Sequence, residues 1–374
     1  MKAEPDPPAH ASAATGRAPP PSGGDAGSDG VHCYLNDIPP FVEDALGRLY
    51  GCLHASLPFF ELFRSTAGAH CYVSLRAGRP ASIFVFTLHG RRLGVLNEMI
   101  EVSQEELEAF ARYVFARFER VDIIRFPALR ARVHDFAFPL QQHPSKATYC
   151  IALPAAPDEY TARIGKSTRA SIHRGLNGLR KRFPSFGMAY RSGRDIDEAE
   201  LRDIIQLSEA NIRVRGARVV HDVDRITALA RKCGFVSVLF IEGRVCAGWI
   251  NYRIGDNFFN DVMGFDRRYE KFGLGKLCGY QTIREAIARG GKRFYLGGGI
   301  FEYKERLLGR PVDMDELNIY RSRRRMLLHL PHVAQALLAA RIRRCKDALH
   351  RNRKHMPARL VLDCFYLLKS WGSK

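Results

Sequence analysis

The sequence contains one order of elements twice, and this internal repeat constrains the fold more than any other feature. In each half, three runs rich in β-branched and aromatic residues are separated by turn residues and followed by a helix and one more strand. The first set is residues 69–75, 81–88 and 92–97, a helix opening at Ser103, and residues 121–126; the second is residues 235–241, 245–253, 257–264, 275–289 and 292–296. The repeat predicts a duplicated domain of mixed α/β class.

Composition divides the 374-residue chain into four parts. Residues 1–30 are rich in Pro, Ala, Gly and Ser and have few large apolar side chains, so they cannot bury enough surface to offset the entropy of ordering and are predicted to be disordered. Residues 31–150 form the first predicted domain and residues 151–325 the second. Residues 326–374 form a basic helical extension.

The net charge of +19 is concentrated in two segments. Residues 161–182 carry seven Lys and Arg and no acidic residue, and residues 321–374 carry fourteen against two acids. This distribution favours an anionic partner, which can be a phosphorylated cofactor, an anionic glycan or lipid surface, or RNA. The C-terminal extension is either a helix pair packed on the second domain or a peripheral contact with an anionic membrane or a membrane-bound polysaccharide synthase.

Several classes of protein are disfavoured by what the sequence lacks. No apolar run is long enough to span a bilayer and no signal core follows the N-terminus, so we expect a cytoplasmic protein. The nine cysteines are scattered without C-x-x-C spacing, and the 13 histidines show neither metal nor triad spacing. The sequence therefore predicts no metal site, and it does not favour a hydrolase.

The most informative segment is residues 264–276, which join a predicted strand to a predicted helix. Gly273 and Gly275 leave backbone amides unobstructed at the start of that helix, where the helix dipole adds partial positive charge. Arg267, Arg268 and Lys276 supplement this charge. The turn follows a strand meander and precedes a strand ending in three glycines. We therefore interpret it as a binding site for a pyrophosphate rather than as a tight turn whose basic side chains are simply solvated.

This segment resembles the coenzyme A pyrophosphate motif of GNAT acyltransferases, R/Q-x-x-G-x-G/A, with Glu270 at the first position where Lys271 or Arg268 can substitute. The segment 294–299 with Tyr303-Lys304, and the basic helix around Arg169, are similar to a GNAT subgroup associated with cellulose and exopolysaccharide biosynthesis. That subgroup is related in architecture to Fem-type aminoacyltransferases. The resemblance implies tandem GNAT-like domains, each with a mainly antiparallel central sheet flanked by helices, and a degenerate first copy that lacks the glycine turn.

The resemblance also implies the site residues. The acyl-coenzyme A site comprises Arg268, Lys271, Phe272, Gly273, Leu274, Gly275 and Lys276. Asp261 is the expected general base, with Asn260 beside it, and a strand-end carboxylate paired with an arginine is the alternative. Tyr303 is either the acid for the departing thiolate or a packed tyrosine. Lys304 and Arg169 are the expected substrate-binding residues, and a solvated Lys304 is the alternative.

These features together predict an acyltransferase that moves an acyl group, most simply acetyl, from acetyl-coenzyme A to an amine or hydroxyl of a small-molecule sugar or glycan precursor. The acceptor class rests on the resemblance alone. Two alternatives stay open. One is a Fem-like aminoacyltransferase whose basic helix binds aminoacyl-tRNA, the one case in which nucleic acid is an expected partner. The other is a non-catalytic accessory protein of polysaccharide assembly.

Overall fold

The computed structural model describes residues 29–345 except 215, 300, 332, 336, 339, 340, 343 and 344. The N-terminal segment predicted to be disordered, and the C-terminal helices predicted beyond residue 333, fall mainly outside the described residues. Of the helices that are described, none combines the length and the apolarity needed to cross a membrane.

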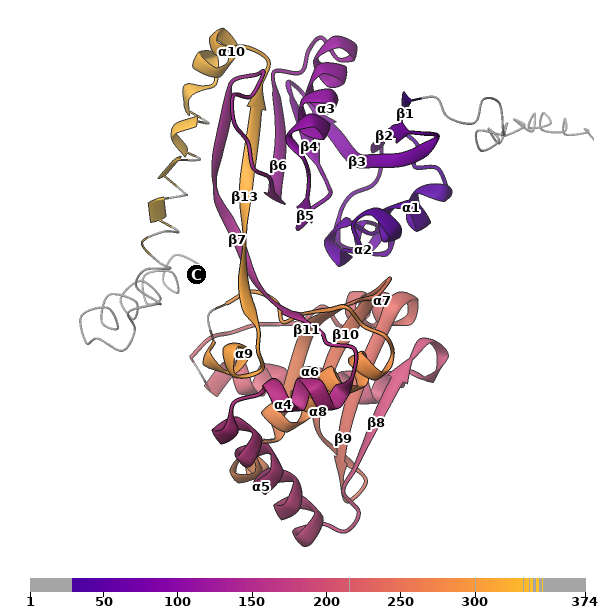
Figure 1. Ribbon diagram of the computed structural model, residues 1–374, viewed down its shortest axis with the longest axis vertical. Coiled ribbons are helices and arrows are strands. Elements are labelled where there is room, and N and C mark those ends of the chain that lie inside the picture. The colour runs from indigo at the N-terminus through magenta and orange to yellow at the C-terminus, as the bar shows by residue number, and fades with distance from the viewer. Residues whose placement is uncertain are drawn as a thin grey trace, which may run out of the picture.

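The first copy contains the predicted meander and helix, preceded by a strand and two helices (Figure 1). Its elements are β1 (Gly30–Tyr34), α1 (Phe41–Leu49), α2 (Leu57–Phe63), β2 (His70–Arg76), β3 (Arg79–His89), β4 (Arg92–Val95), β5 (Ile100–Glu101), α3 (Gln104–Arg117) and β6 (Ile123–Arg130). Helix α3 begins at its N-cap residue Ser103, as predicted, and a capping box stabilises this start: the Ser103 hydroxyl accepts from the Glu106 amide, and the Glu106 carboxylate accepts from the Ser103 amide.

The second copy repeats this order. Its elements are β8 (Gly187–Ser192), α6 (Glu198–Val214), α7 (Val223–Cys233), β9 (Gly234–Ile241), β10 (Arg244–Ile254), β11 (Asn257–Phe265), a 3₁₀ turn (Arg267–Phe272), α8 (Leu274–Ala288) and β12 (Arg293–Tyr295). Two further helices, α4 (Pro157–Arg163) and α5 (Lys166–Arg182), precede β8, and the short α9 (Glu302–Arg306) follows β12.

Two long strands join the copies. Strands β7 (Leu140–Ala152) and β13 (Arg310–Tyr320) pair antiparallel with each other and run between the two halves, as Figure 1 shows. Strand β13 also pairs with β6 of the first copy, and β7 with β12 of the second. The described strands therefore form one continuous sheet in the order β1-β2-β3-β4-β6-β13-β7-β12-β11-β10-β9-β8, with β5 beside β6. The expected boundary at residue 150 lies inside β7.

The predicted fold class is confirmed: both copies are mixed α/β, with a mostly antiparallel sheet flanked by helices. The parallel pairs among the described strands are formed by the strand that follows the helix of each repeat: β6 pairs parallel with β4 and β5, and β12 with β11. A core cluster crosses the seam and includes Leu53 of the first copy and Phe259 of the second. The Asn257 side chain donates to the Gly51 carbonyl across the same seam at 2.8 Å.

Candidate active site

The predicted phosphate turn lies at the N-terminus of α8. Gly273 adopts the left-handed conformation (φ 66°, ψ 42°), which favours glycine, and its amide donates to the Glu270 carbonyl at 2.9 Å. No side chain caps α8 at this residue. The first amides of a helix have no intrahelical acceptor, so those that follow Gly273 are placed to bind an anion.

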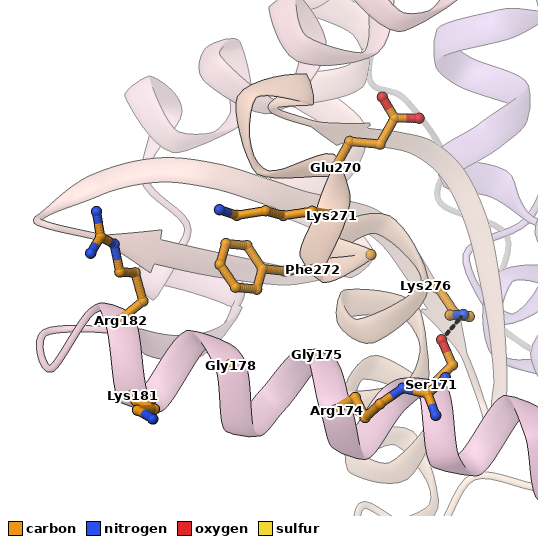
Figure 2. Close-up of a pocket in the computed structure, with 11 residues that line it drawn as sticks. Ser171, Arg174, Gly175, Gly178, Lys181, Arg182, Glu270, Lys271, Phe272 and Lys276 are labelled. Carbon is orange, nitrogen blue, oxygen red and sulfur yellow. Dashed lines mark hydrogen bonds between the residues drawn. The ribbon is translucent and has the colours of Figure 1, made fainter.

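Helix α5 lies across this turn and forms the other wall of a cleft of about 830 Å³. The two walls approach closely because α5 carries glycines where they meet: a Cβ at Gly175 would lie 2.4 Å from the Phe272 carbonyl oxygen, and one at Gly178 would lie 3.1 Å from the Phe272 ring. Figure 2 shows Phe272 between the turn and α5. The cleft is lined by Ser171, Arg174, Gly175, Gly178, Lys181, Arg182, Glu270, Lys271, Phe272, Gly273 and Lys276.

The cleft is strongly basic. Lys276 donates to the Ser171 hydroxyl at 2.7 Å, joining α8 to α5. Desolvation lowers the pKa of Lys276, and the positive charges of Arg306 and Arg174 lower it further. The acid in the lining, Glu270, pairs with Arg267 and points away from α5 in Figure 2. Like charges this close repel one another, so a bound anion would relieve the repulsion.

Of the seven residues predicted to hold the cofactor, four line the cleft: Lys271, Phe272, Gly273 and Lys276. The other three do not. The Arg268 guanidinium is held by the Asp266 carboxylate at 2.6 and 2.9 Å. The Leu274 side chain is buried in the core, and a Cβ at Gly275 would lie 2.9 Å from the Phe265 ring, so at these two positions only the backbone amides at the start of α8 are available to an anion.

The residues of α5 that line the cleft were not among the site residues predicted from the sequence. The one signal for them was the spacing Gly175-x-x-Gly178 within a basic helix, which marks a helix face that another backbone approaches closely. Arg174, Lys181 and Arg182 reach the cleft from this helix.

The sheet opens next to the turn. Strands β11 and β12 pair only over Asn257–Phe259 and Arg293–Tyr295, while β11 continues to Phe265. On its other side β11 has a bulge, since Ile250 of β10 faces Val262 and the next residue, Asn251, faces Asn260. The extra residue is Asp261, and bulges are common beside active sites because they redirect a side chain.

Asp261 has an environment suited to a base. Its carboxylate accepts from the Tyr252 hydroxyl at 3.1 Å. Desolvation by surrounding protein raises the pKa of Asp261, while the Tyr252 hydrogen bond and the nearby His221 act in the opposite direction. The side chain still keeps a solvent-exposed surface. Sequence reasoning did not find Tyr252 or His221, because neither lies within a motif.

The other two predicted catalytic residues lie on the opposite face of β11 from Asp261. Asn260 donates to the Asn251 side chain at 3.0 Å. The Tyr303 hydroxyl lies 3.3 Å from the Met263 sulfur, and both side chains pack against the core under α8. Asp261 instead contacts Tyr252, which belongs to the core cluster on the α6 and α7 side. Asp261 and Tyr303 thus flank the opening between β11 and β12 from two sides.

The two expected substrate-binding residues have structural contacts instead. The Lys304 side chain is buried, and its ammonium donates to the carbonyls of Gly297, Gly298 and Gly299. Burial lowers the pKa of Lys304 to about 8, and the three carbonyl acceptors favour its protonated form. Arg169 donates to two carbonyls at the end of α4 and does not line the cleft. Both residues therefore hold backbone rather than face a ligand.

The first copy closes the region where the second opens. The Met99 amide donates to the Ala128 carbonyl at 2.7 Å, and β5 pairs with β6 beyond it, so the gap between β4 and β6 is filled. The Ser103 side chain caps α3, which occupies the helix end that an anion would otherwise approach. Among the described residues, the first copy therefore lacks both the opening between its strands and the uncapped helix start that the second copy has.

A family model described as an acetyltransferase (GNAT) domain matches residues 166–305, a range that contains α5, the turn and Tyr303. No curated protein matches the sequence.

Three solved structures are similar to the chain. A crystal structure of FemX has a TM-score of 0.58 at 12% identity, covering 79% of this chain and 99% of that one. L-PGS from Bacillus licheniformis has a TM-score of 0.49 at 14% identity, covering 82% and 97%. A tandem GNAT protein from the clavulanic acid biosynthesis pathway has a TM-score of 0.38 at 10% identity, covering 78% and 98%. At such identity the likeness to FemX shows the fold alone. Residues 166–305 thus match an acetyltransferase (GNAT) domain, and the described part of the chain shares the fold of FemX.

Proposed function

We propose that the protein is an acyltransferase that moves an acyl group, with acetyl as the first candidate, from coenzyme A to an amine or hydroxyl of a sugar or glycan precursor. The observation that carries the donor is the cleft at the start of α8, where helix amides and the cations of both walls surround a space of about 830 Å³. A pyrophosphate is the anion that such a turn suits. The acceptor class rests on the similarity to the exopolysaccharide-associated subgroup.

The side chains beside the opening have the chemistry that acyl transfer needs. Asp261 accepts the proton of the acceptor nucleophile as the new bond to the acyl carbon forms. Tyr303, on the other side of β11, donates a proton to the thiolate as the carbon–sulfur bond breaks. Lys276, Lys271 and the first amides of α8 hold the donor's phosphates, so that the thioester reaches the gap between β11 and β12.

Removing the cations nearest the turn should weaken donor binding. We expect acetyl-coenzyme A to bind the purified protein, and the double variant Lys276→Ala/Arg174→Ala to lose about 100- to 10,000-fold in affinity, since each of the two charge-assisted hydrogen bonds contributes roughly 1.5–3 kcal/mol. Isothermal titration calorimetry measures both constants. Arg180→Ala is the matched control, because Arg180 lies on the same helix but does not line the cleft.

An absence of binding by the wild-type protein would reject coenzyme A as donor. A donor of the Fem type, aminoacyl-tRNA, is then favoured, because α5 presents a row of cations to the cleft and phosphate backbones bind such surfaces. If neither donor binds, the accessory role in polysaccharide assembly remains. Contact with an anionic membrane or a polysaccharide synthase is a separate proposal, resting on the basic C-terminus.

The pH dependence of the reaction should report Asp261. A base works when deprotonated, so kcat/KM rises with pH through its pKa. Tyr252→Phe removes the hydroxyl that stabilises the carboxylate, so the pKa rises and the acidic limb of the profile moves to higher pH. A screen of acceptors that follows release of the coenzyme A thiol identifies the best acceptor, and the pH profile is recorded with that acceptor. Tyr190→Phe is the control: Tyr190 contacts α8, and its substitution should leave the acidic limb of the pH profile in place. If the acidic limb does not move in Tyr252→Phe either, Asp261 is excluded as the titrating group.

A further inference from the structure

The cations of the cleft fall into two groups. One group, Arg174 and Lys276, lies with Ser171 near the first half of α5, and the other comprises Lys181, Arg182 and Lys271 at its far end. Figure 2 shows the two groups at opposite ends of the cleft with Phe272 between them. Arg174 and Lys181 are seven positions apart, which is about 10 Å along a helix. A single pyrophosphate at the turn does not need both groups.

The far group has no acidic partner in the part of the chain that the structure describes. No ion pair or hydrogen bond there engages Lys181, Arg182 or Lys271, and the Lys271 ammonium instead lies 5.1 Å from the centroid of the Phe272 ring. Basic side chains in the last turn of a helix interact favourably with the helix dipole whether or not a ligand binds. Arg180 shares that last turn, yet only Lys181 and Arg182 line the cleft together with Lys271.

Phe272 fixes the spacing between the groups. Its ring is packed against Gly178, where any Cβ would come within 3.1–3.2 Å of ring carbons, and its side chain is part of the cleft wall. A ligand that fills the cleft therefore passes an apolar surface between two cationic ends. A nucleoside carrying a diphosphate on one side of its ribose and a further phosphate on the other has this pattern.

We infer that Lys181, Arg182 and Lys271 form a second phosphate subsite, which binds the 3′-phosphate on the ribose of the donor nucleotide. The inference rests on the proposed function, because it assumes that the donor is an acyl-coenzyme A whose pyrophosphate lies at the α8 turn. It adds the prediction that the protein selects the 3′-phosphorylated form of that donor, and that α5 rather than the turn makes this selection.

The test compares acetyl-coenzyme A with its 3′-dephospho analogue by calorimetry. The wild-type protein should bind acetyl-coenzyme A about 10-fold more tightly than the 3′-dephospho analogue, which corresponds to about one charge-assisted hydrogen bond. The double variant Lys181→Ala/Arg182→Ala should lose this difference by weakening only the phosphorylated donor. Arg180→Ala should retain it. Circular dichroism confirms that each variant is folded.

The alternative outcomes separate the two proposals. Equal affinity of the wild-type protein for both donors would overturn the second subsite and leave the proposed function intact. A loss of selectivity in Arg180→Ala as large as in the double variant would also overturn it, because the effect would then be one of general charge. If neither donor binds the wild-type protein, the proposed donor itself is wrong, and the subsite fails with it.

Discussion

Asp261→Asn is expected to lower kcat by about 100- to 10,000-fold, the usual contribution of a positioned general base. The amide occupies nearly the same space at the bulge of β11 but does not accept a proton. Because Asp261 is not part of the cleft lining, the dissociation constant of acetyl-coenzyme A should not change. The rate is followed as thiol release with the best acceptor from the screen, and donor binding by calorimetry.

Asp256→Asn is the matched control for this substitution. Asp256 lies in the turn between β10 and β11 and pairs with Lys292 at 2.7 Å, away from the opening of the sheet. Its loss should leave kcat near the wild-type value. A wild-type rate in Asp261→Asn would show that the carboxylate is held by Tyr252 for a structural reason and that another group removes the proton.

Lys304→Met is expected to lower the free energy of unfolding by about 3–5 kcal/mol. The methionine fills much of the lysine's volume but leaves the carbonyls of Gly297, Gly298 and Gly299 without their ammonium donor. The lysine is only 2% exposed, so water cannot replace it without local rearrangement. Urea denaturation followed by circular dichroism measures the change.

The control is Lys292→Met, which removes a lysine whose side chain is 76% exposed. An exposed ion pair contributes at most about 1 kcal/mol, so this variant should unfold near the wild-type midpoint. If the two variants are equally stable, the three carbonyls do not depend on Lys304, and its burial needs another explanation. Because the two copies share a sheet, unfolding is monitored at two wavelengths to test for an intermediate.

Local patterns were sufficient to predict the meander, the helix and the closing strand of both copies. Alternation of apolar residues gave the strands of each meander, and the Ser103 and Glu106 pair gave the start of α3, because these signals act through neighbours in sequence. The turn at Gly273 was also predicted, since a left-handed residue before a helix favours glycine. The pairing of β7 with β13 between the copies was not predicted, because strand partners distant in sequence leave no local signal.

The sequence by itself determined the duplicated order of elements, the glycine turn and the excess of positive charge in residues 161–182. Only the tertiary structure decided which side chains share a site. It placed Arg174, Lys181 and Arg182 opposite the turn and paired Arg268 with Asp266 away from the cleft. It also buried Lys304 against three carbonyls and brought the Asp261 carboxylate to the Tyr252 hydroxyl. The physical reason is that turns and caps depend on adjacent residues, whereas a cleft between α5 and α8 depends on packing across about a hundred residues of intervening chain, here the fit of Phe272 against Gly175 and Gly178.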